Sequence, residues 1–432
     1  MISTAVIGTD AAIMADEVAG AIAEHLASPT ILAQRRDPPW WPQSLAAGAL
    51  AVALLHIERA RAGLGPWARG HDWLALAAAQ PIGTGNDSHL HHGVPALAFV
   101  LHHGAQDHPA RYGRALAALD NHLATLTRHR LDRAHARIDR ADTTTMAEFD
   151  AIRGLSGLGA LHLTRDPDGD LIRSVLAYLV RLTEPVDDHR ETLPGWWTHL
   201  DPSGRRSAHY PDGHANNGVA HGIGGPLALL SLAARAGVRV DGQTTAITRI
   251  CSWLDRWRRD SPSGPWWPHW ITRAELRAGH SSATAPGRPS WCYGTAGLAR
   301  ARQLAAIALD DPHRRHTAQT ALLDATTPDR ITTFRDASVC HGIAGLLRIT
   351  VRAAADTNDN STETATTDLA GRVPELLATA VRDTAVTTLL NRNELLSGDL
   401  GLFEGAAGVA LALHTTSNAP VPSEWDACLL IS

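Results

Sequence analysis

Seven copies of one glycine-led unit constrain what this chain can fold into. In each copy a glycine is followed three residues later by a second glycine or an alanine, and then by an apolar run rich in alanine and leucine. Successive copies start 45 to 72 residues apart, which leaves room in each interval for one further helix and its loops. Internal repeats of this kind are typical of folds built from similar helical units. The copies start at Gly48, Gly93, Gly154, Gly222, Gly294, Gly342 and Gly405.

The repeat predicts an all-α fold: an α/α toroid of about seven helical hairpins, with an inner and an outer ring of helices. Alanine and leucine are strong helix formers, and runs that are apolar on more than one face are expected to be buried inner helices. Segments between the copies, such as residues 244–260, look amphipathic and are expected outside. No run of alternating strand-like residues stands out. We expect one domain over residues 1–432, with a helical extension over residues 1–39.

Composition and charge exclude several classes of protein. The chain has 39 Lys and Arg against 44 Asp and Glu, a formal net charge of −5, so it lacks the basic surface typical of nucleic-acid binding. No apolar run is long enough to cross a membrane, and no signal peptide begins the sequence. Four cysteines in 432 residues are too few for a disulfide framework. We therefore expect a cytoplasmic protein with reduced thiols.

Metal-type side chains stand directly before three of the glycine turns. Cys292 precedes Gly294 by two residues, Cys340 and His341 lie just before Gly342, and His221 lies just before Gly222. Two thiolates and one imidazole would make a zinc site with three protein ligands, which leaves the fourth position for water or a substrate. Cys292 alone fits a small buried apolar residue at least as well, whereas the Cys340–His341 pair in a glycine turn fits that alternative less well. For Cys251 and Cys428, which lie in apolar segments, core packing is the preferred interpretation.

Six segments, in order from about residue 40 to the C-terminus, make the chain resemble the LanC-like lanthipeptide cyclases of the stand-alone class I type. They are FDAIRGLSG, NNGVAHGIGGPLALL, SWCYGTAG, SVCHGIAG, LFEGAAGVALAL and SEWDACLL. The WCYG and CHG segments together are highly specific for that family, whose α/α toroid agrees with the seven turns. Departures are small: Ala296 stands where the family often has proline, and the first two turns carry Ala51 and Ala96 in place of the second glycine.

The resemblance implies a site, residue by residue. It implies one Zn²⁺ per chain, held by Cys292, Cys340 and His341. It also implies that His221 is an active-site acid or base, that Asp150 lies in the same cavity, and that Arg288 is the family's active-site arginine.

The reaction implied is closure of (methyl)lanthionine thioether rings. A peptide cysteine thiol adds to dehydroalanine or dehydrobutyrine in a dehydrated precursor peptide that carries a leader. Arg288 is expected to stabilise the developing enolate, His221 to move a proton, and Asp150 to orient His221 or take the thiol proton. A separate dehydratase must prepare the substrate, and a complex with that dehydratase or with an exporter is compatible with the sequence.

Three other functions remain open at this stage. A LanC-like protein that adds or binds glutathione would have the same zinc site. A peptide-binding scaffold would need the metal only for structure. A glycan-processing toroid would need a pair of carboxylates, for which the glycine turns offer only Asp150 and Glu404. The tryptophan-rich loops with Trp196, Trp197, Trp266 and Trp267 either contact the peptide or pack on the helices.

Overall fold

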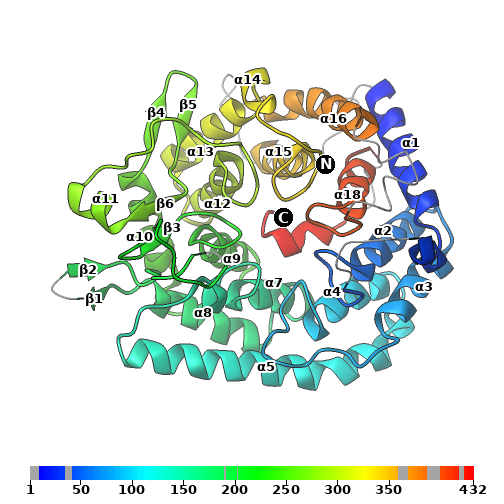
Figure 1. The fold of residues 1–432 in the computed structure, drawn as a ribbon, viewed down its shortest axis with the longest axis horizontal. Coiled ribbons are helices and arrows are strands. Elements are labelled where there is room, and N and C mark those ends of the chain that lie inside the picture. The colour runs from blue at the N-terminus through cyan, green and yellow to red at the C-terminus, as the bar shows by residue number, and fades with distance from the viewer. Residues whose placement is uncertain are drawn as a thin grey trace. The chain divides into compact units, whose positions relative to one another are not determined.

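A computed structural model describes residues 9–34, 41–188, 191–201, 203–358, 368–386, 399–417 and 423–432. The chain forms two compact units, each assembled from two stretches of sequence (Figure 1). Unit 1 comprises Met1–His122 and Ala325–Trp425, and unit 2 comprises Leu123–Asp324 and Asp426–Ser432. Residues 9–25, near the N-terminus, pack with helices from near the C-terminus. Contacts between the two ends of the sequence therefore help to hold unit 1 together.

A helix follows each of the seven glycine turns, as the repeat predicts. Each begins one or two residues after the glycine that leads its copy. Within the described chain these helices are α2 (Ala49–Arg61), α4 (Val94–Ala105), α7 (Leu155–Arg165), α9 (Gly224–Arg235), α12 (Thr295–Ala308), α15 (Ile343–Asn358) and α18 (Ala406–Ser417). Several are buried on all faces: every residue from Thr295 to Ala306 in α12 is buried, as is every residue from Ala49 to Arg59 in α2.

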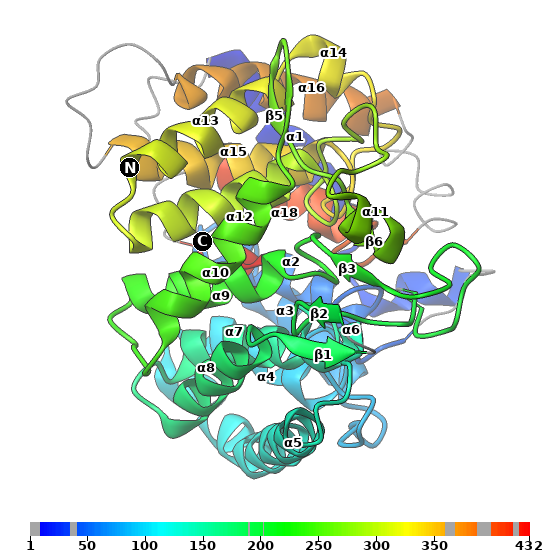
Figure 2. The ribbon, with the colours of Figure 1, turned by 90° about the vertical axis from the view of Figure 1, so that its left-hand side faces the viewer.

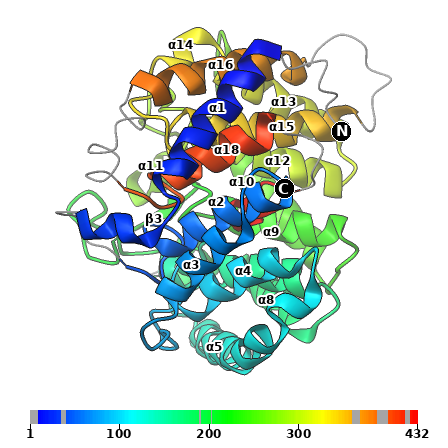
Figure 3. The same cartoon turned by 90° about the vertical axis from the view of Figure 1, so that its right-hand side faces the viewer.

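Unit 1 places α2, α15 and α18 against helices with one apolar face, and α4 packs on α2. These covering helices are α1 (Thr9–His25), α3 (Trp67–Ala77) and α16 (Leu369–Val386). Helix α1 packs along α18 and α16, α2 packs on α3, and α15 packs on α16, as Figure 3 shows for α1, α16 and α18. The unit also holds η2 (Pro29–Gln34), η3 (Pro109–Arg111) and α14 (Pro328–Ile331).

Unit 2 pairs α7, α9 and α12 with amphipathic helices (Figure 2). In α8 (Asp170–Leu182), the buried positions Ile172, Val175, Leu176, Leu179 and Leu182 form one face of the helix. The remaining helices assigned here are α5 (Gly113–Asp139, whose residues from Leu123 on belong to unit 2), α6 (Met146–Phe149), α8 (Asp170–Leu182), α10 (Gln243–Arg256), α11 (Arg273–Ala278), α13 (Pro312–Ala325) and η4 (Trp425–Leu429).

Short strands form in unit 2, although the sequence suggests none. Each of the three antiparallel pairs described contains two strands of three residues, too short to show the alternation by which a strand is recognised. The pairs are β1 (Val186–Asp188) with β2 (Glu191–Leu193), β3 (His214–Asn216) with β6 (Trp270–Thr272), and β4 (Arg259–Ser261) with β5 (Gly264–Trp266). The β3–β6 pair matters for the site because Asn216 lies opposite Trp270.

Four of the glycine turns, those led by Gly154, Gly294, Gly342 and Gly405, share one backbone geometry, which explains why both glycines recur in them. The amide of the second glycine donates to the carbonyl seven residues earlier, and a Cβ on the first glycine would lie 2.0–2.3 Å from the amide nitrogen four residues earlier. The hydrogen bonds are Gly157 to Asp150 (3.3 Å), Gly297 to Ser290 (3.2 Å), Gly345 to Ser338 (3.3 Å) and Gly408 to Gly401 (3.1 Å). The preceding turn is thus wrapped against the helix N-terminus so closely that no side chain fits between them.

Replacing Gly294 with alanine is expected to lower the free energy of unfolding by about 3 kcal/mol, because backbone atoms would have to move to admit the Cβ. That Cβ would lie 2.0 Å from the Ser290 nitrogen and 2.3 Å from the Arg288 oxygen. Gly65→Ala is the matched control, since nothing lies within 4 Å of a Cβ there. Denaturant unfolding of both variants measures the difference, and equal stability of the two would contradict the close approach.

Because His56 is buried, we expect the stability of unit 1 to fall in mild acid. Burial lowers the pKa of His56 from 6.5 to about 4, and its Nε2–H donates to the Leu26 carbonyl over 2.8 Å. The folded pKa lies below the unfolded one, so this stabilisation is present above about pH 6.5 and is lost as the pH falls towards 4. His56→Gln keeps a donor for Leu26 and removes the titration. Its unfolding free energy should therefore fall by about 2 kcal/mol less than that of the wild type between neutral pH and pH of about 4.5. Parallel curves for the two proteins would contradict this assignment.

Candidate active site

In unit 2, backbone hydrogen bonds tie three successive glycine turns together. The Ala151 amide donates to the Ala220 carbonyl over 3.1 Å. The Val219 and Ala220 amides both donate to the Cys292 carbonyl, over 2.9 and 3.2 Å. Residues separated by more than 140 positions in sequence thereby meet at the starts of α7, α9 and α12. The turns that carry Asp150, His221 and Cys292 are adjacent as a result.

Asp150 and His221 form a directly hydrogen-bonded pair. The Asp150 carboxylate is buried, with 1% of its side chain exposed, and its Oδ2 accepts from His221 Nδ1 over 2.6 Å. Its Oδ1 accepts from three amides of its own turn, those of Ile152, Arg153 and Gly154, over 3.1, 2.6 and 2.8 Å. The turn therefore fixes the carboxylate, and the carboxylate fixes the imidazole with Nδ1 as the donor. The His221 side chain is 23% exposed, which leaves Nε2 as the nitrogen available for proton transfer.

Tyr293 lies next to this pair and His269 lies next to Tyr293, although the sequence singles out neither residue. The Tyr293 ring lies 6.2 Å from the His221 ring and 5.8 Å from the His269 ring, measured between centroids. Burial raises the pKa of the Tyr293 phenol well above its usual value, so the phenol remains protonated at neutral pH. The signal for Tyr293 was its place in the WCYG segment, whereas nothing in the sequence near His269 pointed to the site.

Arg288 lies on an exposed segment just before the Cys292 turn. Its carbonyl accepts from the Ser290 amide over 2.8 Å. Burial lowers the pKa of His269; the charge of Cys292 opposes this change and the charge of Arg288 adds to it, so all three groups interact electrostatically. Neither Asp150 nor His221 is hydrogen-bonded to the guanidinium in the described part of the chain. The role expected of Arg288 in the reaction remains a prediction.

Cys292 is half-buried at the start of α12. Its Sγ lies 3.6 Å from the Ser290 hydroxyl, and its carbonyl holds the neighbouring turn as described above. The thiol forms no disulfide.

In unit 1, a second set of turns is joined in the same way. The Val339 and Cys340 amides donate to the Phe403 carbonyl over 3.0 and 2.9 Å, and the Leu402 amide donates to the Ala46 carbonyl over 2.9 Å. The Leu45 amide in turn donates to the His91 carbonyl over 2.9 Å. These contacts fix the loop that presents Cys340 and His341 immediately before α15.

His341 has a carboxylate near each of its ring nitrogens. Its Nε2 lies 3.4 Å from Asp336 Oδ2, and its Nδ1 lies 3.8 Å from Glu404 Oε1. Hydrogen bonding to His341 holds the pKa of Asp336 well below its usual range. A carboxylate next to the nitrogen that does not bind metal is the usual companion of a metal-ligating histidine, because it orients the ring. Cys340, like His341, is half-buried.

Cys292, Cys340 and His341 offer two sulfur donors and one nitrogen donor, a group that could hold a metal ion. The other two cysteines are unsuited to this role. Cys251 and Cys428 are buried, and burial raises the pKa of the Cys251 thiol to about 11. Their expected role in core packing agrees with this burial.

The four loop tryptophans also belong to the core. Trp196, Trp197, Trp266 and Trp267 are between 0% and 4% exposed. The Trp267 indole donates to the Leu254 carbonyl over 2.9 Å. Of the two interpretations left open by the sequence, packing is the one that the structure supports.

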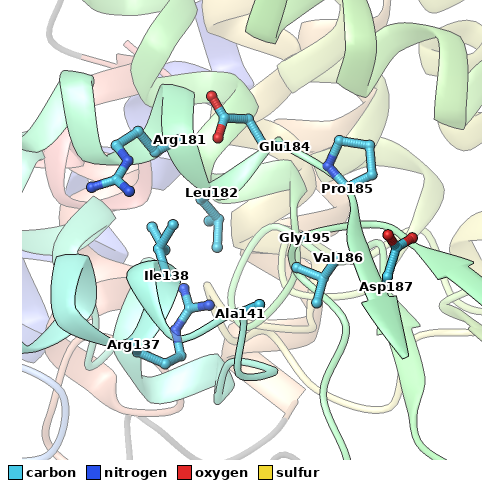
Figure 4. Close-up of a pocket in the computed structure, with 10 residues that line it drawn as sticks. All are labelled: Arg137, Ile138, Ala141, Arg181, Leu182, Glu184, Pro185, Val186, Asp187 and Gly195. Atoms are coloured by element: carbon cyan, nitrogen blue, oxygen red, sulfur yellow. The ribbon is translucent and has the colours of Figure 1, made fainter. Parts of the chain in front are cut away.

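A pocket of about 230 Å³ in unit 2 contains none of these site residues (Figure 4). It is lined by the end of α5, the end of α8 and the start of β1, and its two arginines already have partners. Arg137 donates to Glu148 over 2.8 Å, and Arg181 donates to Asp139 over 2.6 Å.

Among the described residues, no helix is long and apolar enough to cross a membrane.

A family model, a related protein and a solved structure each match this chain, and all three point to the same kind of protein. The family model for lanthionine synthetase C-like proteins matches residues 39–430. The nisin biosynthesis protein NisC of Lactococcus lactis subsp. lactis is 24% identical over 263 residues, so the match spans 60% of this chain and 60% of that protein. A solved structure of nisin cyclase matches with a TM-score of 0.72 at 19% identity, covering 91% of this chain and 93% of the other.

The structural match confirms the expected fold class, an all-α fold of the α/α toroid type. The family match covers the region in which the six signature segments lie, including both turns with cysteine ligand candidates. The chain belongs to the lanthionine synthetase C-like protein family.

Proposed function

We propose that this protein is a zinc-dependent cyclase that forms (methyl)lanthionine rings by adding peptide cysteine thiols to dehydroalanine or dehydrobutyrine. The observation that carries the proposal is the Asp150–His221 pair, fixed next to the Cys292 turn in a chain of this family. The names of the matched relatives, a nisin biosynthesis protein and a nisin cyclase, support the same reaction class.

Cys292, Cys340 and His341 are the proposed zinc ligands. Their chemistry fits the ion, because zinc accepts thiolate and imidazole together and a set of three leaves one position open. When bound, zinc supplies a Lewis acid that keeps a coordinated thiol deprotonated near neutral pH. The proposal requires units 1 and 2 to bring their two contributions together, Cys292 from unit 2 and the Cys340–His341 turn from unit 1.

The proposed reaction gives His221 and Arg288 one role each. A C–S bond forms at the β-carbon, the electrons of the C=C bond move towards the carbonyl oxygen, and a proton is then added at the α-carbon. The proton released by the thiol would be taken up at His221 Nε2, since Nδ1 is committed to Asp150, and His221 would then deliver it to the α-carbon. Arg288 would stabilise the enolate oxygen once its exposed side chain turns towards the substrate.

The substrate in this proposal is a dehydrated precursor peptide with its leader. Because the β-carbon must already be part of a double bond, a dehydratase has to act first. A complex with that dehydratase or with an exporter, and a cytoplasmic location, belong to the same proposal.

Incubation of the purified zinc-loaded protein with a dehydrated, cysteine-containing peptide tests the function. Ring closure consumes free thiol at unchanged peptide mass, so thiol alkylation followed by mass spectrometry is the measurement. Free glutathione is included in the same reaction, because its addition would increase the mass and identify a glutathione-adding protein instead. Binding of the peptide with no loss of thiol would identify a scaffold and reject the cyclase.

A further inference from the structure

Asn216 connects the Tyr293 hydroxyl to the turn that carries His221. Its side chain is fully buried at the end of β3. Its Nδ2 donates to the Tyr293 hydroxyl and to Met146 Sδ, each over 3.3 Å. Its Oδ1 accepts from the Gly218 amide over 2.9 Å, and its backbone carbonyl accepts from the Ile223 amide over 2.9 Å. One residue therefore braces both ends of the His221 turn and the neighbouring phenol.

The Gly218 amide determines which way round the Asn216 carboxamide sits. A backbone N–H can only donate, so the atom facing it must be the carboxamide oxygen. The NH₂ group then faces Tyr293 and Met146, and it can only donate. The Tyr293 oxygen is consequently an acceptor in this contact, and its own proton must point elsewhere. Among the residues that the structure describes, the Tyr293 hydroxyl makes no second hydrogen bond.

We propose that Asn216 is a positioning residue that presents the Tyr293 hydroxyl as a hydrogen-bond donor to the substrate held beside His221. The inference rests on the proposed function, because the acceptor is the carbonyl oxygen of the dehydro residue under attack. Negative charge develops on that oxygen as the C–S bond forms, and a prearranged donor stabilises it without transferring its proton. Were Asn216 an acceptor, the phenol would turn inward and this donor would be lost.

Asn217 provides a matched control. It is 1% exposed, but its carboxamide bonds elsewhere: Nδ2 donates to the Pro268 carbonyl and Oδ1 accepts from the Trp253 indole, each over 2.9 Å. Asn217→Asp therefore places a carboxylate in a buried site next to Asn216 in sequence without changing any atom that touches Tyr293. Any general cost of a buried charge should appear in both Asp variants.

The direction of the hydroxyl can be measured without an activity assay. The chain has only four tyrosines, so protein labelled with ¹³Cζ-tyrosine gives few signals, and Tyr293→Phe assigns one of them. In Asn216→Asp the phenol should donate to the new carboxylate, which moves its ¹³Cζ signal towards that of tyrosinate. Asn217→Asp should leave the signal in place. If Asn216→Asp does not fold, Asn216→Leu serves, since loss of the donor must also move the signal. An unchanged Tyr293 signal in the folded variant overturns the assignment.

Kinetics with the dehydrated peptide test the role in the reaction. Asn216→Asp and Tyr293→Phe are each expected to lower kcat by about 10²-fold at little change in KM, the usual effect of losing one such donor. The double variant should be no slower than Tyr293→Phe, because Asn216 acts through Tyr293. Independent, multiplying effects would overturn the proposal, as would an equal loss of kcat in Asn217→Asp. If the wild type closes no ring, the proposed function fails, while the NMR shift still decides the direction of the hydroxyl.

Discussion

Replacing His221 with alanine is expected to lower kcat for ring closure by about 10²- to 10⁴-fold, the range typical of a lost general acid or base. The residue has the exposure and geometry for this role: Nδ1 is bound to a buried carboxylate, and Nε2 belongs to a side chain that is 23% exposed. Alanine removes the group proposed to deliver the proton to the α-carbon but leaves the backbone of the turn intact. Single-turnover assays on a dehydrated peptide measure the effect.

Asp150→Asn should cause a comparable loss by a different route. An asparagine can keep its oxygen on the three turn amides that Asp150 Oδ1 now accepts. Its NH₂ group would then face His221 Nδ1, which forces that nitrogen to accept and moves the ring proton to Nε2. The imidazole would be held in the wrong tautomer for taking up a proton at Nε2.

An exposed histidine supplies the control for both variants. His122 on α5 is exposed, so His122→Ala should keep wild-type kcat and stability. Wild-type rates in His221→Ala and Asp150→Asn would reject the pair as catalytic residues. A loss of rate that disappears when the data are corrected for unfolded protein would assign the pair a structural role only.

If the proposed function holds, replacing Cys340 with alanine is expected to abolish zinc binding and, with it, nearly all cyclase activity. Two protein donors would remain of three, and zinc in proteins is held by at least three in catalytic sites of this kind. We expect about one zinc per chain in the wild type by elemental analysis and close to none in the variant. Ring closure should fall in proportion to the metal lost.

Cys251→Ala is the matched cysteine control. Cys251, like Cys340, forms no disulfide, but it is fully buried in α10, and burial raises the pKa of its thiol to about 11. This variant should lose some stability from the small cavity and keep its zinc. Retention of zinc by Cys340→Ala, or equal loss from both variants, would contradict the ligand assignment. Circular dichroism of each variant separates loss of metal from loss of α15 and its neighbours.

Much of the fold could be predicted because the signals for its helices lie within short stretches of sequence. All seven helices that follow the turns show the same pattern: a glycine, a second glycine or an alanine three residues later, and a run rich in alanine and leucine. In the turns led by Gly154, Gly294, Gly342 and Gly405, the first glycine is packed against backbone four residues earlier, so the requirement lies within a few residues of sequence. The candidate residues Cys292, Cys340, His341 and His221 were recognised because they stand next to those glycines.

The three short strand pairs could not be predicted in this way. Three residues are too few to show alternation, and the partner of β3 lies more than 50 residues further along the chain. The same is true of Asn216, which looks like an ordinary polar residue until the β3–β6 pair and the WCYG turn meet around it.

The sequence by itself determined the all-α architecture, the positions of the inner helices and the chemical types available at the turns, since each depends on neighbours within about one helical turn. Only the tertiary structure decided which of those side chains come together and which hydrogen bonds they form. It brings Asp150 to His221 across 71 residues, places Tyr293 beside them and sets the direction of the Asn216 carboxamide. The physical reason is that hydrogen bonding is directional and short-ranged, so which groups pair depends on backbone contacts between distant turns rather than on the residues that flank them.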